Sequence, residues 1–216
     1  MVGSEDGRLA AALILRLLVT WCEQCPPAVT ALLATPAPSD EDLVARARRG
    51  ERDAEEALYR RHAPYVGRFV AHLLGSATDA EDVLQETFCL ALDRLADLRE
   101  PAAFRGWVAQ IAINRVRRHF RARRLLRFFG LGSQAAGLEG LIAQDVSGET
   151  RAELALLDAA LDRISSDERI PWILHHVEGV QLDEAARLLG CSLATVKRRI
   201  GAAQAAVDRH RGSRDE

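Results

Sequence analysis

Two stretches of this sequence carry the cations that are best able to bind phosphate. From Arg115 to Arg127, thirteen residues include seven arginines and no acid. Near the C-terminus, Lys197, Arg198 and Arg199 follow one another in the sequence GCSLATVKRR, residues 190–199. Guanidinium groups bind phosphates and the edge of guanine, and both occur in nucleic acids. Because the formal net charge of the chain is only -2, it is the distribution of charge that indicates a nucleic-acid partner.

The C-terminal cations lie in the second helix of a predicted helix-turn-helix. Gly190 suits the left-handed backbone that ends a helix, and Ser192 suits the N-cap of the next helix. The second helix directs Thr195, Lys197 and Arg198 away from the core, where they can reach phosphates and base edges. Its inward stripe is formed by Val196, Ile200, Ala203 and Val207. The alternative is an ordinary helical hairpin whose exposed face happens to be charged.

A third stretch is acidic. Four of the eight residues from Asp79 to Glu86 are acids, and none is basic. Thr78 and Glu81 have the spacing of a capping box, which predicts that a helix starts there. The helix exposes the acids together with Gln85 and buries an apolar stripe on its other side. This stripe comprises Val83, Leu84, Phe88, Ala91, Leu92 and Leu95.

Helices must position these stretches, because leucine and alanine dominate the chain and only 5% of its residues are aromatic. Ser39 and the three acids after it predict a helix to about residue 49, and two more helices are predicted at about 53–74 and 102–124. Five glycines between Gly130 and Gly148 indicate a linker. The sequence therefore predicts an all-α protein with two small helical domains joined by a flexible linker, the C-terminal one a helix-turn-helix. The predicted parts are an N-terminal extension at 1–38, a first domain at 39–127, the linker at 128–148 and a second domain at 149–211.

Other classes of protein have little support in the sequence. It contains no nucleophile-base pair, phosphate loop or paired-histidine metal motif, so we predict no enzyme, no catalytic residue, no metal site and no cofactor. Cys22 and Cys25 form a lone C-x-x-C, which is weak support for a zinc or redox role. The apolar run from Leu9 to Trp21 is shorter than the roughly 20 residues of a membrane span, and Arg16 interrupts it. No membrane insertion is therefore expected.

Three segments, in their order along the chain, resemble the extracytoplasmic-function group of bacterial RNA polymerase sigma factors. They are TDAEDVLQETFCLALDRL, FRGWVAQIAINRVRRHFRARR and HHVEGVQLDEAARLLGCSLATVKRRIGAAQ. The resemblance implies a cytoplasmic sigma factor that binds core RNA polymerase and directs promoter recognition and DNA melting in transcription initiation. The implied partners are core RNA polymerase, promoter DNA and, as is common in the family, an anti-sigma factor.

The resemblance also implies roles for individual residues. The acidic helix of the family docks on the largest polymerase subunit, which implies core-binding roles for Asp79, Asp82, Gln85 and Glu86. Contacts with the melted -10 element are implied for Leu98, Arg99, Phe104, Trp107, Asn114, Arg115, Arg117 and Arg118. Contacts with the duplex -35 element are implied for Ser192, Thr195, Lys197, Arg198 and Arg199. Trp107 also lies on an apolar stripe, so a role in the core is an equally good interpretation of this residue.

One rival function uses the same helix-turn-helix. In this alternative the chain is a two-domain transcriptional regulator that senses a ligand with its first half and never replaces a polymerase subunit. The two hypotheses differ in whether the acidic face of residues 79–86 binds core polymerase.

Overall fold

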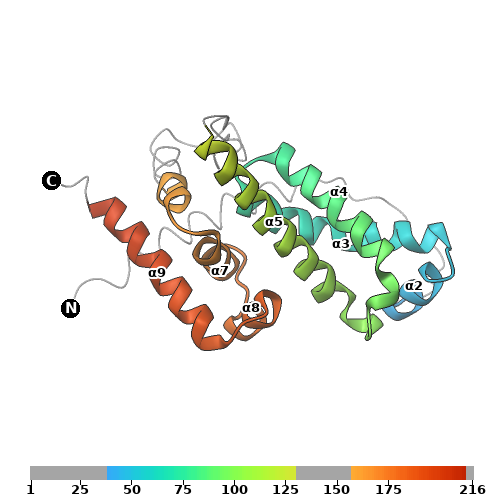
Figure 1. The fold of residues 1–216 in the computed structure, drawn as a ribbon. Coiled ribbons are helices and arrows are strands. Elements are labelled where there is room, and N and C mark those ends of the chain that lie inside the picture. The colour runs from blue at the N-terminus through green and yellow to red at the C-terminus, as the bar shows by residue number, and fades with distance from the viewer. Residues whose placement is uncertain (1–37, 130–156, 213–216) are drawn as a thin grey trace, which may run out of the picture.

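The computed structural model describes residues 38–129 and 157–212, and the regular elements within these ranges are all helical (Figure 1). The predicted linker lies outside the described residues except for its first two positions, and so do Cys22, Cys25 and the first 37 residues of the predicted extension. The prediction of an all-α fold is confirmed.

The first helices begin and end where local signals place them. Helix α2 (Asp40–Ala47) starts after Ser39, whose hydroxyl accepts a hydrogen bond from the backbone N–H of Asp42 at 3.1 Å. Helix α3 (Arg52–Leu74) ends at Gly75, which has the left-handed φ of 67° that glycine adopts without strain. Both boundaries agree with the sequence prediction.

The predicted start of the acidic helix is wrong by two residues. Helix α4 (Ala77–Asp93) has Ser76 as its N-cap, with the Ser76 hydroxyl 3.3 Å from the backbone N–H of Asp79. Thr78 therefore lies within the first turn and does not form a capping box with Glu81. The physical reason is that Gly75 ends α3 and the next residue already supplies a capping hydroxyl.

Helices α3, α4 and α5 form the core of the first unit, with α2 packed on α3. Gly67 of α3 allows the close approach of α4, because a Cβ atom at this position would lie only 3.3 Å from Cδ2 of Leu84. Large side chains that are fully buried in this unit include Leu43, Leu58, Phe69, Leu73, Phe104 and Ile113.

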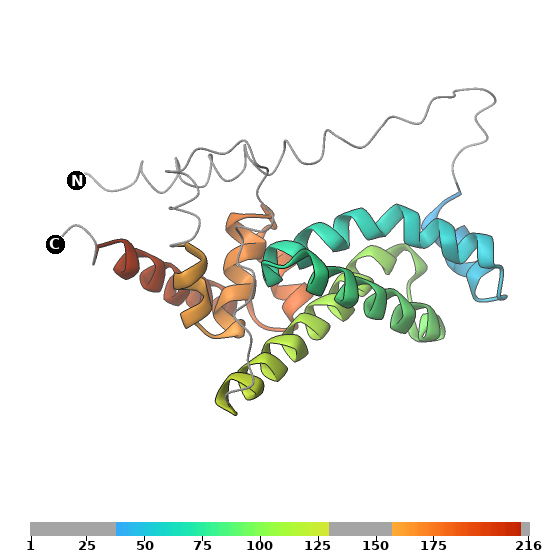
Figure 2. The same ribbon diagram turned by 90° about the horizontal axis from the view of Figure 1, so that it is seen from above.

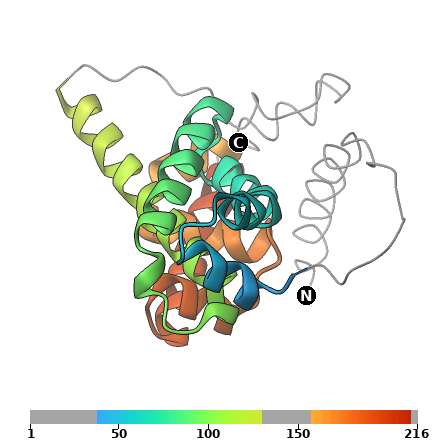
Figure 3. The same cartoon turned by 90° about the vertical axis from the view of Figure 1, so that its right-hand side faces the viewer.

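Two short 3-10 turns, η1 (Leu95–Asp97) and η2 (Pro101–Ala103), connect α4 to α5. Helix α5 (Phe104–Phe128) starts after η2 and continues four residues beyond its predicted end. Figures 2 and 3 show that its last turns extend beyond the other helices, and Leu125 and Leu126 are exposed there.

The second unit contains a helical segment at 157–163 and the helices α7 (Ser166–His176), α8 (Leu182–Leu189) and α9 (Leu193–Gly212). Trp172 of α7 donates a hydrogen bond from Nε1 to Oε1 of Gln204 in α9 at 2.9 Å. Gly190 ends α8 with a φ of 63°, and the Ser192 hydroxyl accepts from the N–H of Thr195 at 3.2 Å. The predicted helix-turn-helix is confirmed.

Candidate nucleic-acid interface

Helix α9 has one buried face and one cationic face. Val196, Ala203 and Val207 are buried, as the predicted stripe requires, and Ile200 is half-buried. On the other face, Lys197 and Arg198 are exposed. Side chains in this position after a capped turn can enter the major groove of DNA.

The other predicted members of this face differ in their surroundings. Ser192 is exposed and Thr195 is half-buried, and their hydroxyl oxygens lie 2.9 Å apart. Arg199 turns toward α7, where its Nη2 lies 3.3 Å from Oδ2 of Asp167. The structure therefore groups Ser192, Lys197 and Arg198 on an open face and pairs Arg199 with an acid of the same unit.

Helix α5 presents a second cationic surface. Asn114 and Arg118 are exposed, whereas Arg115 and Arg117 are half-buried. Arg115 Nη1 lies 3.2 Å from Oε2 of Glu86, and Arg117 Nη1 donates to Oδ1 of Asn114 at 3.3 Å. A row of cations along one helix is suited to the backbone of a melted strand.

The turn between α4 and α5 places its predicted DNA-contacting residues in two environments. The side chains of Leu98 and Phe104 are buried, with 4% and 0% of their surface exposed, while Arg99 is exposed. Neither Leu98 nor Phe104 reaches the surface in this conformation, because both fill the core beneath the turn. The exposed surface of the turn therefore consists of the residues between them.

The position of Trp107 fits both roles that the sequence left open for it, a role in the core and a contact with DNA. Its ring centroid is 6.1 Å from that of Phe104, at an interplanar angle of 51°, and the residue is half-buried. The indole packs against the core and remains partly accessible.

The acidic face of α4 is largely open to solvent. Asp82, Gln85 and Glu86 are exposed, while Asp79 is half-buried with its Oδ2 atom 3.6 Å from Nε2 of His119 in α5. Burial lowers the pKa of His119, although the nearby Asp79 carboxylate acts in the opposite direction. Helices α4 and α5 lie side by side (Figure 1), so the acidic and the arginine-rich surfaces are adjacent.

Contacts between the two units involve residues that sequence reasoning missed. The side chain of Glu178 is only 2% exposed; its carboxylate lies 3.0 Å from Arg68 Nε and also contacts His72 Nδ1. Burial raises the pKa of Glu178, but its interactions with His72 and Arg68 outweigh this effect and leave the pKa below its ordinary value. A second contact joins Gln110 Nε2 to the carbonyl oxygen of Arg187 at 2.9 Å.

Asp167 at the start of α7 faces both cationic surfaces. Besides its contact with Arg199, its Oδ1 lies 3.7 Å from Nε of Arg117 in α5. Nothing in the local sequence could have predicted these pairs, because their partners are far apart along the chain.

The fold and these surfaces define a helical DNA-binding protein with two units. Within residues 38–129 and 157–212, no group of three or more His, Cys, Asp and Glu side chains is placed to hold a metal ion. Among the described helices, none combines the length and the apolar character needed to cross a membrane.

Comparison with known proteins gives the family. The family models of Sigma-70 region 2 and Sigma-70, region 4 match residues 58–125 and 154–205. RNA polymerase sigma factor CnrH of Cupriavidus metallidurans is 32% identical over 178 residues, which cover 79% of this chain and 93% of CnrH. The ECF RNA polymerase sigma factor BldN of Streptomyces coelicolor is 30% identical over 158 residues, which cover 72% of this chain and 60% of BldN.

Solved structures show the same similarity. The structure of CnrH in complex with the cytosolic domain of CnrY has a TM-score of 0.57 and 28% sequence identity, and covers 82% of this chain and 99% of that chain. The chain therefore belongs to the extracytoplasmic-function group of the sigma-70 family of RNA polymerase sigma factors. It is a sigma factor for transcription initiation whose partners are core RNA polymerase and promoter DNA, and the rival role of a regulator that replaces no polymerase subunit is not favoured.

Proposed function

We propose that the two units of this sigma factor divide the work at the promoter. The first unit docks on core RNA polymerase through α4 and holds the melted -10 element with α5 and the turn before it. The second unit binds the duplex -35 element with α9. The observation that carries this proposal is the adjacency of α4 and α5, because one rigid unit then presents an acidic face to the polymerase and a cationic face to DNA.

The docking surface consists of Asp82, Gln85 and Glu86, with Asp79 at its edge. Exposed carboxylates and an amide suit a basic partner surface, and such complementarity sets the rate and the specificity of association. Glu86 is also paired with Arg115, so the polymerase and the DNA surfaces share an ion pair.

The -10 surface combines charge with an aromatic edge. The backbone of a strand can be held by Arg118 and Asn114 and by the partly paired Arg115 and Arg117. Trp107 is partly accessible and can supply an aromatic ring. Melted DNA is held by this combination of cations and aromatic rings. The turn itself offers Arg99 to Ala103, above the buried side chains of its two ends.

The -35 surface consists of Ser192, Thr195, Lys197 and Arg198, with Arg199 paired to Asp167. We propose that the two units move apart to make both contacts at once. The -10 and -35 elements lie about 25 base pairs apart, which is about 85 Å of B-DNA at roughly 3.4 Å per step. Helix α5, with 25 residues, is only about 37 Å long at 1.5 Å per residue, and the two units contact each other directly here.

We assign this protein no enzymatic activity and place it in the bacterial cytoplasm, where core polymerase and promoters are found. CnrH, to which it is similar, forms a complex with the cytosolic domain of CnrY. We propose that an anti-sigma factor is the regulator of this chain.

The test of the docking surface is a binding titration of core polymerase with the full chain. We expect the double variant Asp82→Arg, Gln85→Ala to lose most of its affinity, because a repulsive charge replaces an attractive one at the centre of the face. The control is Glu56→Arg, which reverses an exposed acid of α3 outside the docking surface. Equal affinities of the wild type and the double variant would refute the proposed docking surface.

A further inference from the structure

Arg48 joins the end of α2 to the turn that leads from α4 into α5. Its Nε and Nη2 atoms lie 3.2 and 3.1 Å from the carbonyl oxygen of Leu95, and Nη2 also donates to the carbonyl oxygen of Leu98. The two carbonyls stand at the start of η1 and directly after it. One side chain thereby holds both ends of a 3-10 turn, a structure whose own hydrogen bonds are poor in geometry.

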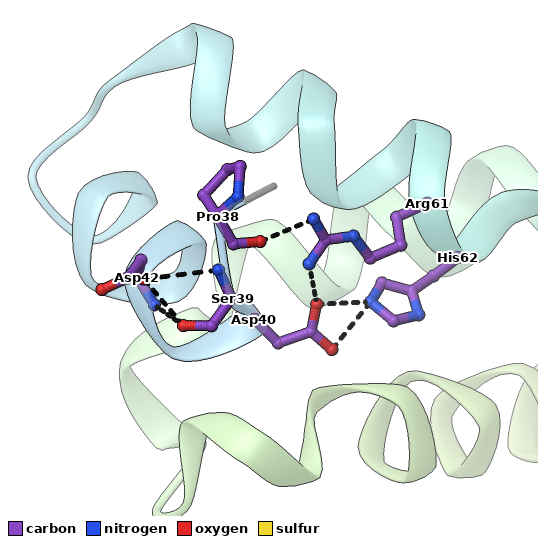
Figure 4. Close-up of polar contacts among 6 residues, drawn as sticks. All are labelled: Pro38, Ser39, Asp40, Asp42, Arg61 and His62. Atoms are coloured by element: carbon purple, nitrogen blue, oxygen red, sulfur yellow. Dashed lines mark hydrogen bonds and ion pairs between the residues drawn. The ribbon is translucent and has the colours of Figure 1, made fainter. Parts of the chain in front are cut away.

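The other end of α2 is fixed to α3 (Figure 4). Asp40 Oδ1 accepts a hydrogen bond from Arg61 Nη1 at 2.7 Å, and Asp40 Oδ2 lies 3.0 Å from Nε2 of the buried His62. Arg61 also donates from Nη2 to the carbonyl oxygen of Pro38 at 2.7 Å. Because the apolar face of α2 is buried as well, this helix is a fixed support from which Arg48 reaches the turn.

The far end of the turn is held by His62, the residue that also contacts Asp40. The ring of His62 packs against that of Phe104, with 5.1 Å between the centroids and an interplanar angle of 52°. Residues 99–103, all exposed except the half-buried Pro101, therefore lie between two fixed points. These points are the Leu98 carbonyl, which Arg48 holds, and the Phe104 ring, which packs on His62. A base that leaves the stack binds most tightly to a pocket that already has its bound shape, because the pocket then loses no conformational freedom on binding.

We propose that Arg48 is a positioning residue for recognition of the -10 element. This positioning role rests on the proposed function of the turn in holding an unstacked base, and it explains why the turn has one fixed shape. Arg48 lies before residue 58, where the match to Sigma-70 region 2 begins. Without its guanidinium the carbonyls of Leu95 and Leu98 bond to water, the turn takes several shapes, and the preference for one base over another falls.

The experiment uses holoenzyme made from core polymerase and the full chain. The probe is a fork-junction DNA whose non-template -10 segment has random bases, and sequencing of the bound fraction gives the enrichment of the best base over the worst at each position. This ratio does not depend on how much of a variant is folded, because inactive protein lowers the binding of all sequences equally. Core affinity of each variant is measured in parallel.

We expect Arg48→Ala to lower the enrichment ratio by about fivefold at one or two adjacent positions, the effect of about 1 kcal/mol of lost hydrogen bonding. Arg48→Lys keeps one donor group and should lie between the wild type and Arg48→Ala. The matched control is Arg49→Ala, since Arg49 is also exposed at the end of α2 but bonds to Glu51 and not to the turn. Arg49→Ala should keep the wild-type ratios.

Wild-type ratios in Arg48→Ala would overturn the positioning role while leaving the proposed function intact. A general loss of core affinity with unchanged ratios would also overturn it, because Arg48 would then serve only the stability of the unit. Absence of any base preference in the wild type would instead contradict the proposed function of the turn, and the role of Arg48 with it.

Discussion

One buried carboxylate, that of Glu178, contributes to the contact between the two units, and removal of its charge should shift the molecule toward a more open form. Glu178 contacts Arg68 and His72 of α3, which lie 110 and 106 residues away in the sequence. Glu178→Gln keeps the shape of the side chain and one acceptor oxygen but removes the charge. The change therefore tests the charge of the carboxylate and not the packing around it.

The size of the effect follows from the exposure of the partners. Hydrogen bonds to charged groups contribute about 1.5–3 kcal/mol each. The Arg68 side chain is 46% exposed and stays hydrated when its partner is lost, so its share is small, whereas His72 is 10% exposed. We estimate a loss of about 2 kcal/mol, which is roughly a 30-fold shift from the closed to the open arrangement.

The assay is a distance measurement between spin labels on Cys89 of α4 and Cys191 of the helix-turn-helix, with Cys22 and Cys25 replaced by serine. Both label sites are free cysteines in the described structure. Glu178→Gln should increase the population at long distance. The control Glu56→Gln, which breaks an exposed pair with Arg60 inside α3, should not. An unchanged distance distribution in Glu178→Gln would refute the reasoning.

The same contact has a predictable response to acid. Because the pKa of Glu178 in the closed form is lowered, the contribution of this group is fully present above the ordinary glutamate pKa. It is lost as the pH falls through the lowered pKa. We therefore expect acidification below about pH 4 to open the wild type, with a smaller effect in Glu178→Gln.

Three further outcomes are expected. Gly190→Ala should lower the free energy of unfolding by about 1–2 kcal/mol in chemical denaturation. The φ of Gly190 is 63°, and a Cβ atom there would meet no atom within 4 Å, so the cost is backbone strain alone. Replacing Lys197 and Arg198 by alanine should lower the slope of log affinity against log salt by about 2 on -35 duplex DNA, at about 0.9 per phosphate contact, and an unchanged slope would exclude phosphate contacts. Burial, with a smaller effect of His175, lowers the pKa of His176. NMR titration should therefore show the His176 ring gaining its proton below about pH 6.5, and the fold should lose stability as the pH falls past that value. Titration of His176 at or above that pH would contradict this prediction.

Local signals predicted the parts of the fold that depend on neighbouring residues. Gly75 and Gly190 end helices, and Ser39 and Ser192 start them, because each acts on backbone groups within three residues. The start of α4 was missed because Ser76 and Thr78 are both capping residues, and only the position of the preceding helix decides between them.

The contacts that organise the site could not be predicted in this way. Arg48 bonds to carbonyls 47 and 50 residues away, and Glu178 lies more than 100 residues from its partners. No periodicity in the sequence encodes such pairs. Likewise, motif resemblance assigned Leu98 and Phe104 to the DNA surface, but only the packed structure reveals that their side chains are in the core.

The most direct test of the central claim is to map the 5′ ends of transcripts that core polymerase makes from genomic DNA with and without this chain. Our account predicts a new set of transcripts that start downstream of two shared sequence elements, centred near -10 and -35. Asp82→Arg, Gln85→Ala should abolish this set, while Glu56→Arg should keep it. The same transcripts with and without the chain would contradict the assignment of this protein as a promoter-directing sigma factor.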